Sequence, residues 1–418
     1  MGDPVDDSAD EVFFAEWQRR RPGERRDVAR AGAVARELGI TAPRRRVVAV
    51  VGSKGKGTAA TYASACLAAH GRRVVTVTGP ALRRNAERIR VNGRAVSDAT
   101  LRELGGRLRT AIGRVRRRGG YLSPAGLFLL AGVLHAERER ADVLVLEAGM
   151  GGRSDEISLF PPDVLAIGTI FAEHIGVLGD DVVEIAREKA SVVAAGTHAV
   201  LSLPQRAAVG AEIARVVAER TGDAVTPVVA RPDSDGLPAG IRPDGFNAAN
   251  AGLGYRAGIA AAGLLGGEPP PAARLDAVLR SVTLPGRLSW HQVPGAEVLV
   301  DSAISRPGIA AALAAARHRW GSVDRVLVCL PDHKDLDGAV AELAGTPVTF
   351  VRLPGTHLRF RRALPADWEV IDLTGLRLSA YGPRVVALGT VYFTGRVLDL
   401  LGAGTERLFS VGAGDDGA

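Results

Sequence analysis

Apolar and mixed stretches alternate along the first two thirds of the chain, and this alternation predicts strands followed by helices. Apolar runs typical of buried strands cover residues 47–51, 73–78, 141–146, 164–170 and 198–203. Stretches with helical character cover residues 12–38, 99–118, 123–139, 184–193 and 245–265. Strands that alternate with helices are typical of an α/β fold with a mainly parallel sheet.

The last third repeats the alternation over a shorter length. Strands are expected at residues 297–301, 325–330, 348–352 and 385–388, with a helix at 310–320. The sequence LPGR precedes this region and marks a boundary, so we expect two domains, residues 1–287 and 288–418. Residues 1–11 are expected to fray, and 411–418 to form a loose tail.

Composition agrees with a globular protein. The chain has 418 residues, of which 46% are hydrophobic, and no stretch approaches the roughly 18 uncharged apolar residues of a membrane span. The acidic start of the chain lacks the apolar core of a secretory signal. Two distant cysteines, Cys66 and Cys329, are typical of buried small residues in a reducing compartment. These features together predict a cytoplasmic protein.

The formal net charge of +7 raises the question of a nucleic-acid partner. Basic clusters occur at residues 19–21, 44–46 and 114–118, but they are short, scattered and poor in aromatic neighbours. A solvated, arginine-rich surface explains them better. We therefore expect neither a nucleic-acid nor a membrane partner.

A glycine-rich sequence, GSKGKGT, separates the first buried strand from an alanine-rich helix. Strand, glycine-rich loop and helix form a P-loop, whose backbone N–H groups and helix N-terminus bind phosphate. Lys56 is expected to reach the β- and γ-phosphates, and the Thr58 hydroxyl to hold Mg²⁺. The alternative is a glycine-rich turn with a chance lysine. The candidate nucleotide-binding residues of the loop are Gly52, Ser53, Lys54, Gly55, Lys56, Gly57 and Thr58.

Lysine is rare in this chain, which makes each lysine informative. Among 53 basic residues only Lys54, Lys56, Lys189 and Lys334 are lysines. Arginine does not replace a compact ammonium on a phosphate or an amine that must react. Two of the four lysines are therefore candidates for chemistry.

Candidate ligands follow successive strands. Thr58, Glu147 and His174 lie on βα loops, so the carboxyl ends of the strands are expected to bring them to one edge of the sheet. An aspartate, Asp180 or Asp181, is expected to cap the helix that carries Lys189.

The ordered motifs GSKGKGT, ERIRVNG, LEAGMGGRSD, EHIGVLGDDVVEIAREKA, PGR and LGTVYFTG resemble those of the Mur ligase superfamily. The closest similarity is to its folylpolyglutamate synthase and dihydrofolate synthase branch, over residues 47–397. The resemblance implies an N-terminal P-loop ATPase domain, a C-terminal Rossmann-like α/β domain and an active site between them. It also implies ATP-dependent activation of a carboxylate as an acyl phosphate, which an amine converts to an amide.

The resemblance further implies roles for single residues. Thr58, Glu147 and His174 match metal-binding positions, and Lys189 matches a lysine that relatives carbamylate to hold a second Mg²⁺. Asn250 matches the asparagine of the helix on the nucleotide side, and Arg287 matches the arginine that reaches the nucleotide. The implied catalytic set is Lys56, Lys189, His174 and Asp301. The alternative is an exposed helix-end pair for Glu147 and Lys189 and an ordinary loop histidine for His174.

The substrate side departs from the family pattern. Ala81 stands where folate ligases have a loop histidine, and residues 123–126 replace a phenylalanine–glutamate pair. Ile304 replaces a histidine that helps to hold glutamate, which removes a donor. Arg306 is either a new anion contact or a surface arginine, while Thr390 and Tyr392 keep hydroxyls near the amine site.

Three functions are compatible with a chain that matches the family on the ATP side and departs from it on the substrate side. The first is an ATP-dependent amide ligase repurposed for a specialised pathway, taking a small-molecule carboxylate and an amine. The second is a genuine folylpolyglutamate or dihydrofolate synthase with altered loops, and the third is a non-catalytic ATP-binding relative. We expect a monomer or weak homo-oligomer in each case.

Overall fold

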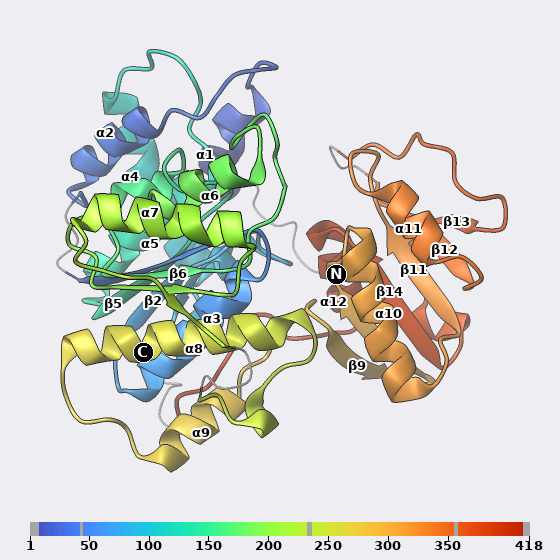
Figure 1. Ribbon diagram of the computed structural model, residues 1–418. Helices are drawn as coiled ribbons and strands as arrows, with labels where there is room; N and C mark the ends of the chain where they lie inside the picture. Colours follow the sequence, from blue (N-terminus) through green and yellow to red (C-terminus); the bar gives the residue numbers. More distant parts are fainter. Residues whose placement is uncertain (1–7, 42–44, 232–235, 355–357, 413–418) are drawn as a thin grey trace. The chain divides into compact units, whose positions relative to one another are not determined.

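A computed structural model describes residues 8–41, 45–231, 236–354 and 358–412 (Figure 1). The chain forms two compact units. Unit 1 comprises residues 1–80, 85–282 and 406–418, and unit 2 comprises residues 81–84 and 283–405. Each unit has its own sheet, which confirms the predicted fold class of two α/β regions with mainly parallel sheets.

Unit 1 is built on an eight-stranded sheet. Its strands in spatial order are β4 (Arg94–Ala95), β3 (Ile89–Val91), β2 (Val74–Val77), β5 (Val143–Glu147), β1 (Arg46–Val51), β6 (Val164–Ile167), β7 (Ala199–Ser202) and β8 (Val228–Val229). All neighbours pair in parallel except β2 with β3 and β3 with β4. The β1 strand, which leads into the P-loop, therefore lies between β5 and β6.

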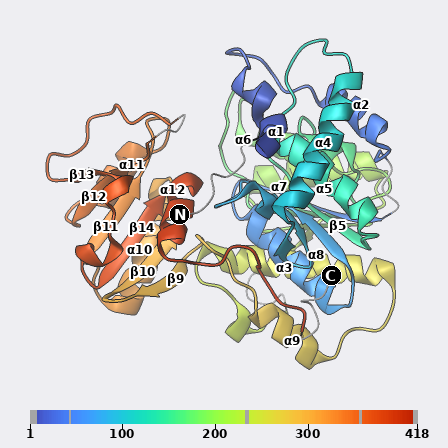
Figure 2. The ribbon, with the colours of Figure 1, turned by 180° about the vertical axis from the view of Figure 1, so that it is seen from behind.

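Helices cover both faces of this sheet (Figures 1 and 2). The helices of unit 1 are α1 (Ser8–Gln18), α2 (Val28–Leu38), α3 (Lys56–Ala69), α4 (Asp98–Arg114), α5 (Pro124–Arg138), α6 (Val182–Ala190), α7 (Ala207–Thr221), α8 (Phe246–Leu265) and α9 (Ala272–Arg280). Helices α3 and α8 pack together on one face, and α5 lies on the other beneath α1, α2 and α4. Short 3₁₀ helices occur at Asn85–Arg88, Glu156–Leu159 and Ala239–Ile241.

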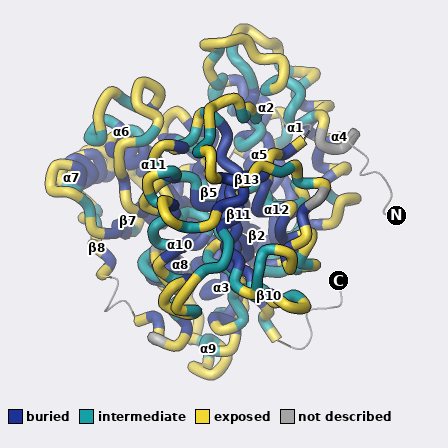
Figure 3. Tube along the Cα trace, turned by 90° about the vertical axis from the view of Figure 1, so that its right-hand side faces the viewer, coloured by how far each residue is buried: buried dark blue, intermediate teal, exposed yellow. Residues whose placement is uncertain are grey.

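The β1 strand shows why the sequence folds in this way. Val47, Ala49 and Val51 join the core on the α5 face, and the alternate residues Val48 and Val50 point to the α3 face and are fully buried. An apolar run without polar interruption is what a strand covered on both faces requires. Figure 3 shows the central strands as buried and the outer turns as exposed.

Unit 2 contains a six-stranded sheet with helices on both faces. The strands in spatial order are β13 (Glu369–Asp372), β12 (Val348–Arg352), β11 (Arg325–Cys329), β14 (Arg384–Gly389), β10 (Ala296–Asp301) and β9 (Ser289–Val293), and β9 alone among them is antiparallel. One core packs against α10 (Arg306–Trp320) and α11 (Leu336–Glu342), the other against α12 (Val391–Leu400). Short 3₁₀ helices lie at Leu373–Gly375 and Leu378–Tyr381.

Two expectations about the chain's organisation were wrong. The helix expected over residues 12–38 is two helices, because Pro22 and Gly23 form a turn between them. The start of α1 at Ser8 also places residues 8–11 in a helix, whereas the fraying expected of residues 1–7 lies outside the described residues. The units also exchange two segments that the boundary at residue 287 did not anticipate.

Both exchanged segments are tied down by side-chain and backbone contacts. Leu82 packs against the α12 core of unit 2, and Arg83 forms an ion pair with Asp399. The end of the chain returns to unit 1, where Ala95 N donates to Glu406 O at 2.7 Å and Phe409 is buried. The described part of the predicted loose tail, residues 411–412, follows this contact, and residues 413–418 lie outside the described residues.

The two cysteines lie in α3 and β11 and are buried and unpaired. Across the helices that the structure describes, none combines the length and apolar character needed to cross a membrane.

Candidate active site

The predicted P-loop spans from the end of β1 to the start of α3. Gly55 caps α3 in the left-handed conformation, with φ of 76°. A Cβ added to Gly55 would lie 2.2 Å from the Asn250 amide, so the loop and the start of α8 approach more closely than any other residue permits. The N-terminal N–H groups of α3 are thereby presented at the loop, as anion binding requires.

Two lysines converge on the same carbonyl of this loop. The Lys56 ammonium donates to Gly52 O at 3.2 Å, and the Lys189 ammonium donates to it at 3.2 Å. Lys189 also donates to Met150 O at 2.7 Å and pairs with Glu173 at 3.2 Å. It is completely buried, so the alternative of an exposed helix-end lysine was wrong.

The surroundings of Lys189 make its positive charge costly. Burial lowers the pKa of Lys189, the nearby Lys56 ammonium lowers this pKa further, and the Glu173 carboxylate opposes both effects. Two ammonium groups beside one loop form a positive site, which a polyanion such as a triphosphate would stabilise.

The predicted metal ligands lie around the same loop. In the register of the sheet Glu147 is the partner of Val50, one residue before the end of β1. Its carboxylate accepts from Gly79 N at 2.9 Å, and its Oε2 would lie 3.6 Å from a Cβ at Gly57. Thr58 is buried, with its hydroxyl 3.1 Å from Asn247 Oδ1.

His174 lies on an exposed loop after β6 and has φ of 52°, a left-handed conformation that histidine adopts more readily than branched residues. Its neighbour Glu173 faces Lys189. Asp181 caps α6 by accepting from Val183 N and Glu184 N, both at 2.8 Å, which fixes the start of the helix that carries Lys189. The aspartate left open between positions 180 and 181 is thus Asp181.

The candidate oxygen ligands of this region suit a Mg²⁺ ion that is also bound by substrate phosphates. They do not form a site in which protein side chains alone would hold a metal ion. Among the described residues, no three His, Cys, Asp or Glu side chains form a metal-binding cluster. Mg²⁺ in nucleotide sites is commonly held by one or two protein oxygens and by substrate phosphates, which is compatible with Thr58 and Glu147. A carbamate on Lys189 and a second Mg²⁺ stay predictions.

Unit 2 holds the predicted residues of the C-terminal half. Asp301 ends β10, and its carboxylate accepts from Leu288 N at 2.7 Å, which ties the PGR segment to the sheet. Burial raises the pKa of Asp301, and the Arg287 guanidinium opposes this rise. Ser302 reinforces the same junction, because its hydroxyl donates to Gly286 O and is hydrogen-bonded with the Thr394 hydroxyl, both at 3.1 Å.

The predicted substrate residues of unit 2 have different environments. Thr390 precedes α12, is 7% exposed, and its Oγ1 has no hydrogen-bond partner within the described part of the chain. Tyr392 is half exposed, and Ile304 packs against the α10 core. Arg306 pairs with Glu342 at 3.4 Å, which is how a surface arginine behaves, and Ala81 is half-buried in the exchanged segment.

Curated relatives match part of the chain. A dihydrofolate synthase/folylpolyglutamate synthase of Escherichia coli is 30% identical over 189 residues, 44% of this chain and 43% of the relative. A probable bifunctional folylpolyglutamate synthase/dihydropteroate synthase of Haloferax volcanii is 33% identical over 188 residues, 45% of this chain and 22% of the relative. The matched parts therefore span less than half of either relative. No family model matches the chain.

Solved structures match nearly the whole chain. The apo form of L. casei FPGS has a TM-score of 0.78 at 21% identity and covers 94% of this chain and 98% of its own. Folylpolyglutamate synthase of Mycobacterium tuberculosis, complexed with ADP and AMPPCP, has a TM-score of 0.75 at 21% identity, covering 95% and 99%. The relatives and solved structures that match this chain are folylpolyglutamate and dihydrofolate synthases, which confirms the resemblance predicted from the sequence motifs.

A buried carboxyl group, that of Glu156, lies beside the segment 123–126 that the resemblance marks as altered. Gly126 stands in the segment that replaces the family's phenylalanine–glutamate pair, and a Cβ there would lie 2.2 Å from Cδ of Glu156. The missing side chain at 126 makes room for the Glu156 carboxyl, which accepts from Ser123 Oγ at 2.8 Å. The sequence analysis did not identify this contact. Sequence spacing could not reveal it, because the two positions are distant along the chain.

A second set of contacts joins this carboxyl to the P-loop. Arg26 lies 3.0 Å from Asp155 and 3.6 Å from Glu156. Asp155 also accepts from Met150 N at 3.0 Å, and Met150 O accepts from Lys189. The loop after β5 thus connects Arg26 to the buried lysine. The sequence analysis singled out Lys189 and the motif that contains Met150 and Asp155, but not Arg26.

Glu156 should make stability depend on pH. Burial and the neighbouring Asp155 raise the pKa of Glu156, whereas Arg26 lowers it to a smaller extent. Between the ordinary carboxyl pKa and the raised one, the folded state keeps a proton that the unfolded chain releases, so stability falls as pH rises through this window. We expect Glu156→Gln to be more stable than wild type by about 1–3 kcal/mol above the window. The gain should shrink toward pH 4.5.

Urea unfolding at several pH values between 4.5 and 8 measures this effect. Glu137→Gln is the matched control, because Glu137 is a partly exposed glutamate at the other end of α5. A gain that is absent at pH 8, or equal at both ends of the range, would show that Glu156 is not held as an acid with a raised pKa.

Proposed function

We propose that this protein is an ATP-dependent ligase that joins a carboxylic acid to an amino group. The observation that carries the proposal is the convergence of Lys56 and Lys189 on Gly52 O, beside Glu147 and the start of α3. A site of this kind neutralises and orients a transferring phosphoryl group. The homologues support it, since a folylpolyglutamate synthase of this fold is known in complex with the ATP analogue AMPPCP.

The reaction proceeds in two steps. A carboxylate oxygen attacks the γ-phosphorus, the bond between that phosphorus and the β–γ bridging oxygen breaks, and ADP leaves. The amine nitrogen then attacks the acyl carbon, phosphate leaves with the C–O bond electrons, and the amine loses its proton to a base or to solvent. Lys56 and the α3 N-terminus hold the phosphates, and Mg²⁺, when bound, stabilises the negative charge that develops on them.

The acid and the amine are assigned less directly. Of the interpretations that the sequence left open, the homologues favour a folate-type substrate pair over a repurposed pathway. We therefore propose a pterin-containing acid and glutamate as the substrates, in the cytoplasm, with a monomeric or weakly oligomeric protein.

A repurposed ligase is the second candidate. The observations in its favour are Ile304, which packs in an apolar core, and Arg306, which pairs with Glu342. Neither side chain offers the anion contact that a glutamate carboxylate would use. The buried Thr390 hydroxyl at the start of α12 is the group that we propose for this contact instead.

Release of ADP over a matrix of acids and amines tests the proposal. Dihydropteroate or a reduced folate with glutamate should release ADP, and each acid or amine alone should not. ADP release with another acid and amine, but not with folates, would replace the folate assignment by a repurposed ligase. ADP release without either partner would contradict ligase activity altogether.

A further inference from the structure

The loop that follows β5 is fastened to α6, the helix that carries Lys189. The Glu188 carboxylate accepts from Gly152 N at 3.3 Å and from Ser154 N and Ser154 Oγ, both at 2.6 Å. A Cβ on Gly152 would lie 2.5 Å from Glu188 O, so the loop touches the helix directly. Because Lys189 follows Glu188 in α6, residues 152–154 are held next to the helix turn that carries the buried ammonium.

The Asp155 carboxylate closes this loop on itself and on Arg26. One of its oxygens, Oδ2, accepts from Met150 N and from Arg26 Nη1, both at 3.0 Å. Gly149 leaves the space for this arrangement, since a Cβ there would lie 3.1 Å from Asp155 Oδ2 and 3.7 Å from Arg26 Nη1. Asp155 is 1% exposed, and a carboxylate buried to this extent needs a compensating charge. Arg26 supplies that charge from outside the loop.

The backbone at Arg26 is held by contacts that do not involve the loop. Arg26 forms a parallel β-bridge with Tyr121. In this bridge Asp27 N donates to Tyr121 O at 3.0 Å, and Tyr121 N donates to Arg25 O at 3.1 Å. Arg26 is therefore anchored to the segment before α5.

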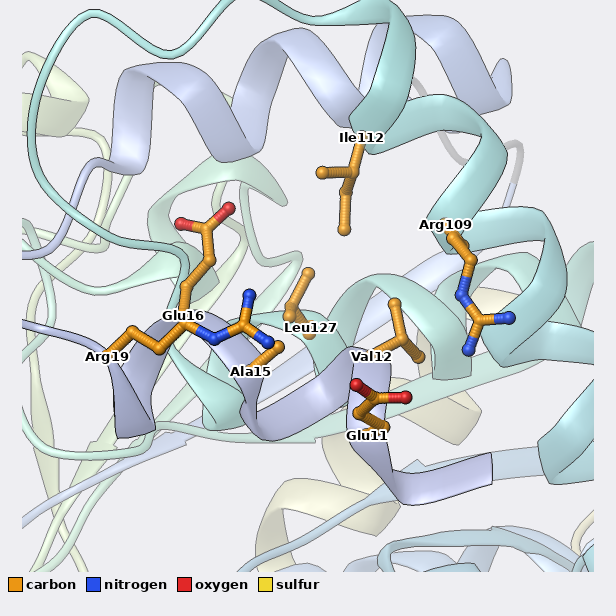
Figure 4. Close-up of a pocket in the computed structure, with 8 residues that line it drawn as sticks. All are labelled: Glu11, Val12, Ala15, Glu16, Arg19, Arg109, Ile112 and Leu127. Atoms are coloured by element: carbon orange, nitrogen blue, oxygen red, sulfur yellow. The ribbon is translucent and has the colours of Figure 1, made fainter. Parts of the chain in front are cut away.

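Glu16, on α1, strengthens the anchor. It lines the hollow between α1, α4 and α5 (Figure 4), and its carboxylate accepts from Arg30 Nη1 at 2.8 Å and from Leu122 N at 3.0 Å. Arg30 lies in the first turn of α2, and Leu122 follows Tyr121. Both sides of the bridge are thus tied to α1, so Arg26 keeps its place independently of Asp155.

The same loop carries a carbonyl that holds Lys189. Met150 donates through its N–H to Asp155 and accepts through its carbonyl from the Lys189 ammonium at 2.7 Å. Asp155 also acts on Lys189 by its charge. Burial lowers the pKa of Lys189 and the Lys56 ammonium lowers it further, whereas Glu173 and Asp155 raise it. The loop therefore reaches the ammonium through a hydrogen bond and through electrostatic attraction.

We propose that Arg26 is a positioning residue for Lys189. Its guanidinium holds the Asp155 carboxylate against Met150 N, which keeps Met150 O at the Lys189 ammonium. Lys189 is thereby kept at Gly52 O, beside the P-loop. The consequence for turnover rests on the proposed ligase function, whereas the consequence for Lys189 itself does not.

NMR of protein that contains isotope-labelled lysine tests the effect on Lys189 without any substrate. The chain has only four lysines, so the side-chain signal that is missing from Lys189→Met belongs to Lys189. Arg26→Met should shift this signal and leave that of Lys334, in unit 2, unchanged. Arg25→Met removes the same charge from an exposed neighbour and is the matched control, with all four signals at their wild-type positions. A Lys189 signal that stays in place in folded Arg26→Met would overturn the proposal.

ADP release tests the consequence for catalysis. Arg26→Met should lower kcat about tenfold and change the KM for ATP by less than about twofold, because a misplaced group acts mainly on the transition state. In an Asp155→Asn background, Arg26→Met should lower kcat much less, since Arg26 acts through this carboxylate. Equal losses in both backgrounds would overturn the proposal.

Circular dichroism and urea unfolding establish that each variant is folded. If Arg26→Met does not fold, Asp155→Asn carries the test, because it removes the other half of the ion pair with little change of shape. Its Lys189 signal should also shift, and an unshifted signal would overturn the proposal. If no acid and amine release ADP, the proposed function fails, and the Lys189 signal still decides whether Arg26 positions this lysine.

Discussion

Replacing Lys56 by methionine is expected to reduce ATP-dependent turnover about 10²- to 10³-fold, while the protein stays folded. Lys56 is half-buried, and its ammonium donates to Gly52 O. Methionine has a similar unbranched side chain, so the substitution removes mainly the charge. That charge is needed mainly while the γ-phosphoryl group is transferred, when negative charge shifts toward the leaving ADP. ADP release at saturating acid and amine measures the rate, and urea unfolding measures stability.

Two further lysine variants make the Lys56 result specific. Lys56→Arg keeps a positive charge but is expected to lose most activity, because a planar guanidinium does not fit where a compact ammonium binds phosphate. Lys334→Met removes a partly buried lysine of unit 2 and should leave turnover unchanged. A Lys56→Met protein that turned over at the wild-type rate would contradict the assignment of the P-loop to ATP.

Local patterns predicted the parts of the structure that depend on neighbouring residues. The run of residues 47–51 predicted β1, because a strand buried on both faces has no polar interruption. The glycine-rich loop predicted the turn into α3, where Gly55 adopts a left-handed conformation that favours glycine. Glu147 was placed correctly beside the P-loop by a topological rule, since parallel strands end at one edge of a sheet.

Contacts between distant segments could not be predicted in the same way. Residues 81–84 leave unit 1 because Leu82 packs in another core, and hydrophobicity alone does not say in which core a leucine is buried. The Arg26–Asp155 pair joins positions 129 residues apart. The sequence analysis assigned no role to Glu173, although it supplies the counter-charge of a buried lysine. Each contact depends on tertiary packing, which spacing along the chain does not determine.

Replacing Lys189 by methionine is expected to damage both stability and activity. The ammonium bonds Gly52 O and Met150 O and pairs with Glu173, so its removal leaves a carboxylate and two carbonyls without this donor. Breaking a buried ion pair costs about 3–5 kcal/mol, and the lower end applies because the Glu173 side chain is 16% exposed. Urea unfolding should show this loss. The double variant with Glu173→Gln should recover part of it, since no unpaired carboxylate remains.

The dependence on CO₂ separates two chemical roles of Lys189. A carbamate forms when the neutral amine attacks CO₂ and a proton is released, and the burial that lowers the pKa of Lys189 increases the neutral fraction. If the carbamate is the active form, wild-type ADP release should fall when CO₂ is removed and return with bicarbonate. If the ammonium is the active form, ADP release should not respond to CO₂, and the proposals of a carbamate and of a second Mg²⁺ would be wrong. Lys189→Met should be insensitive to bicarbonate in either case, so it controls for effects elsewhere in the protein.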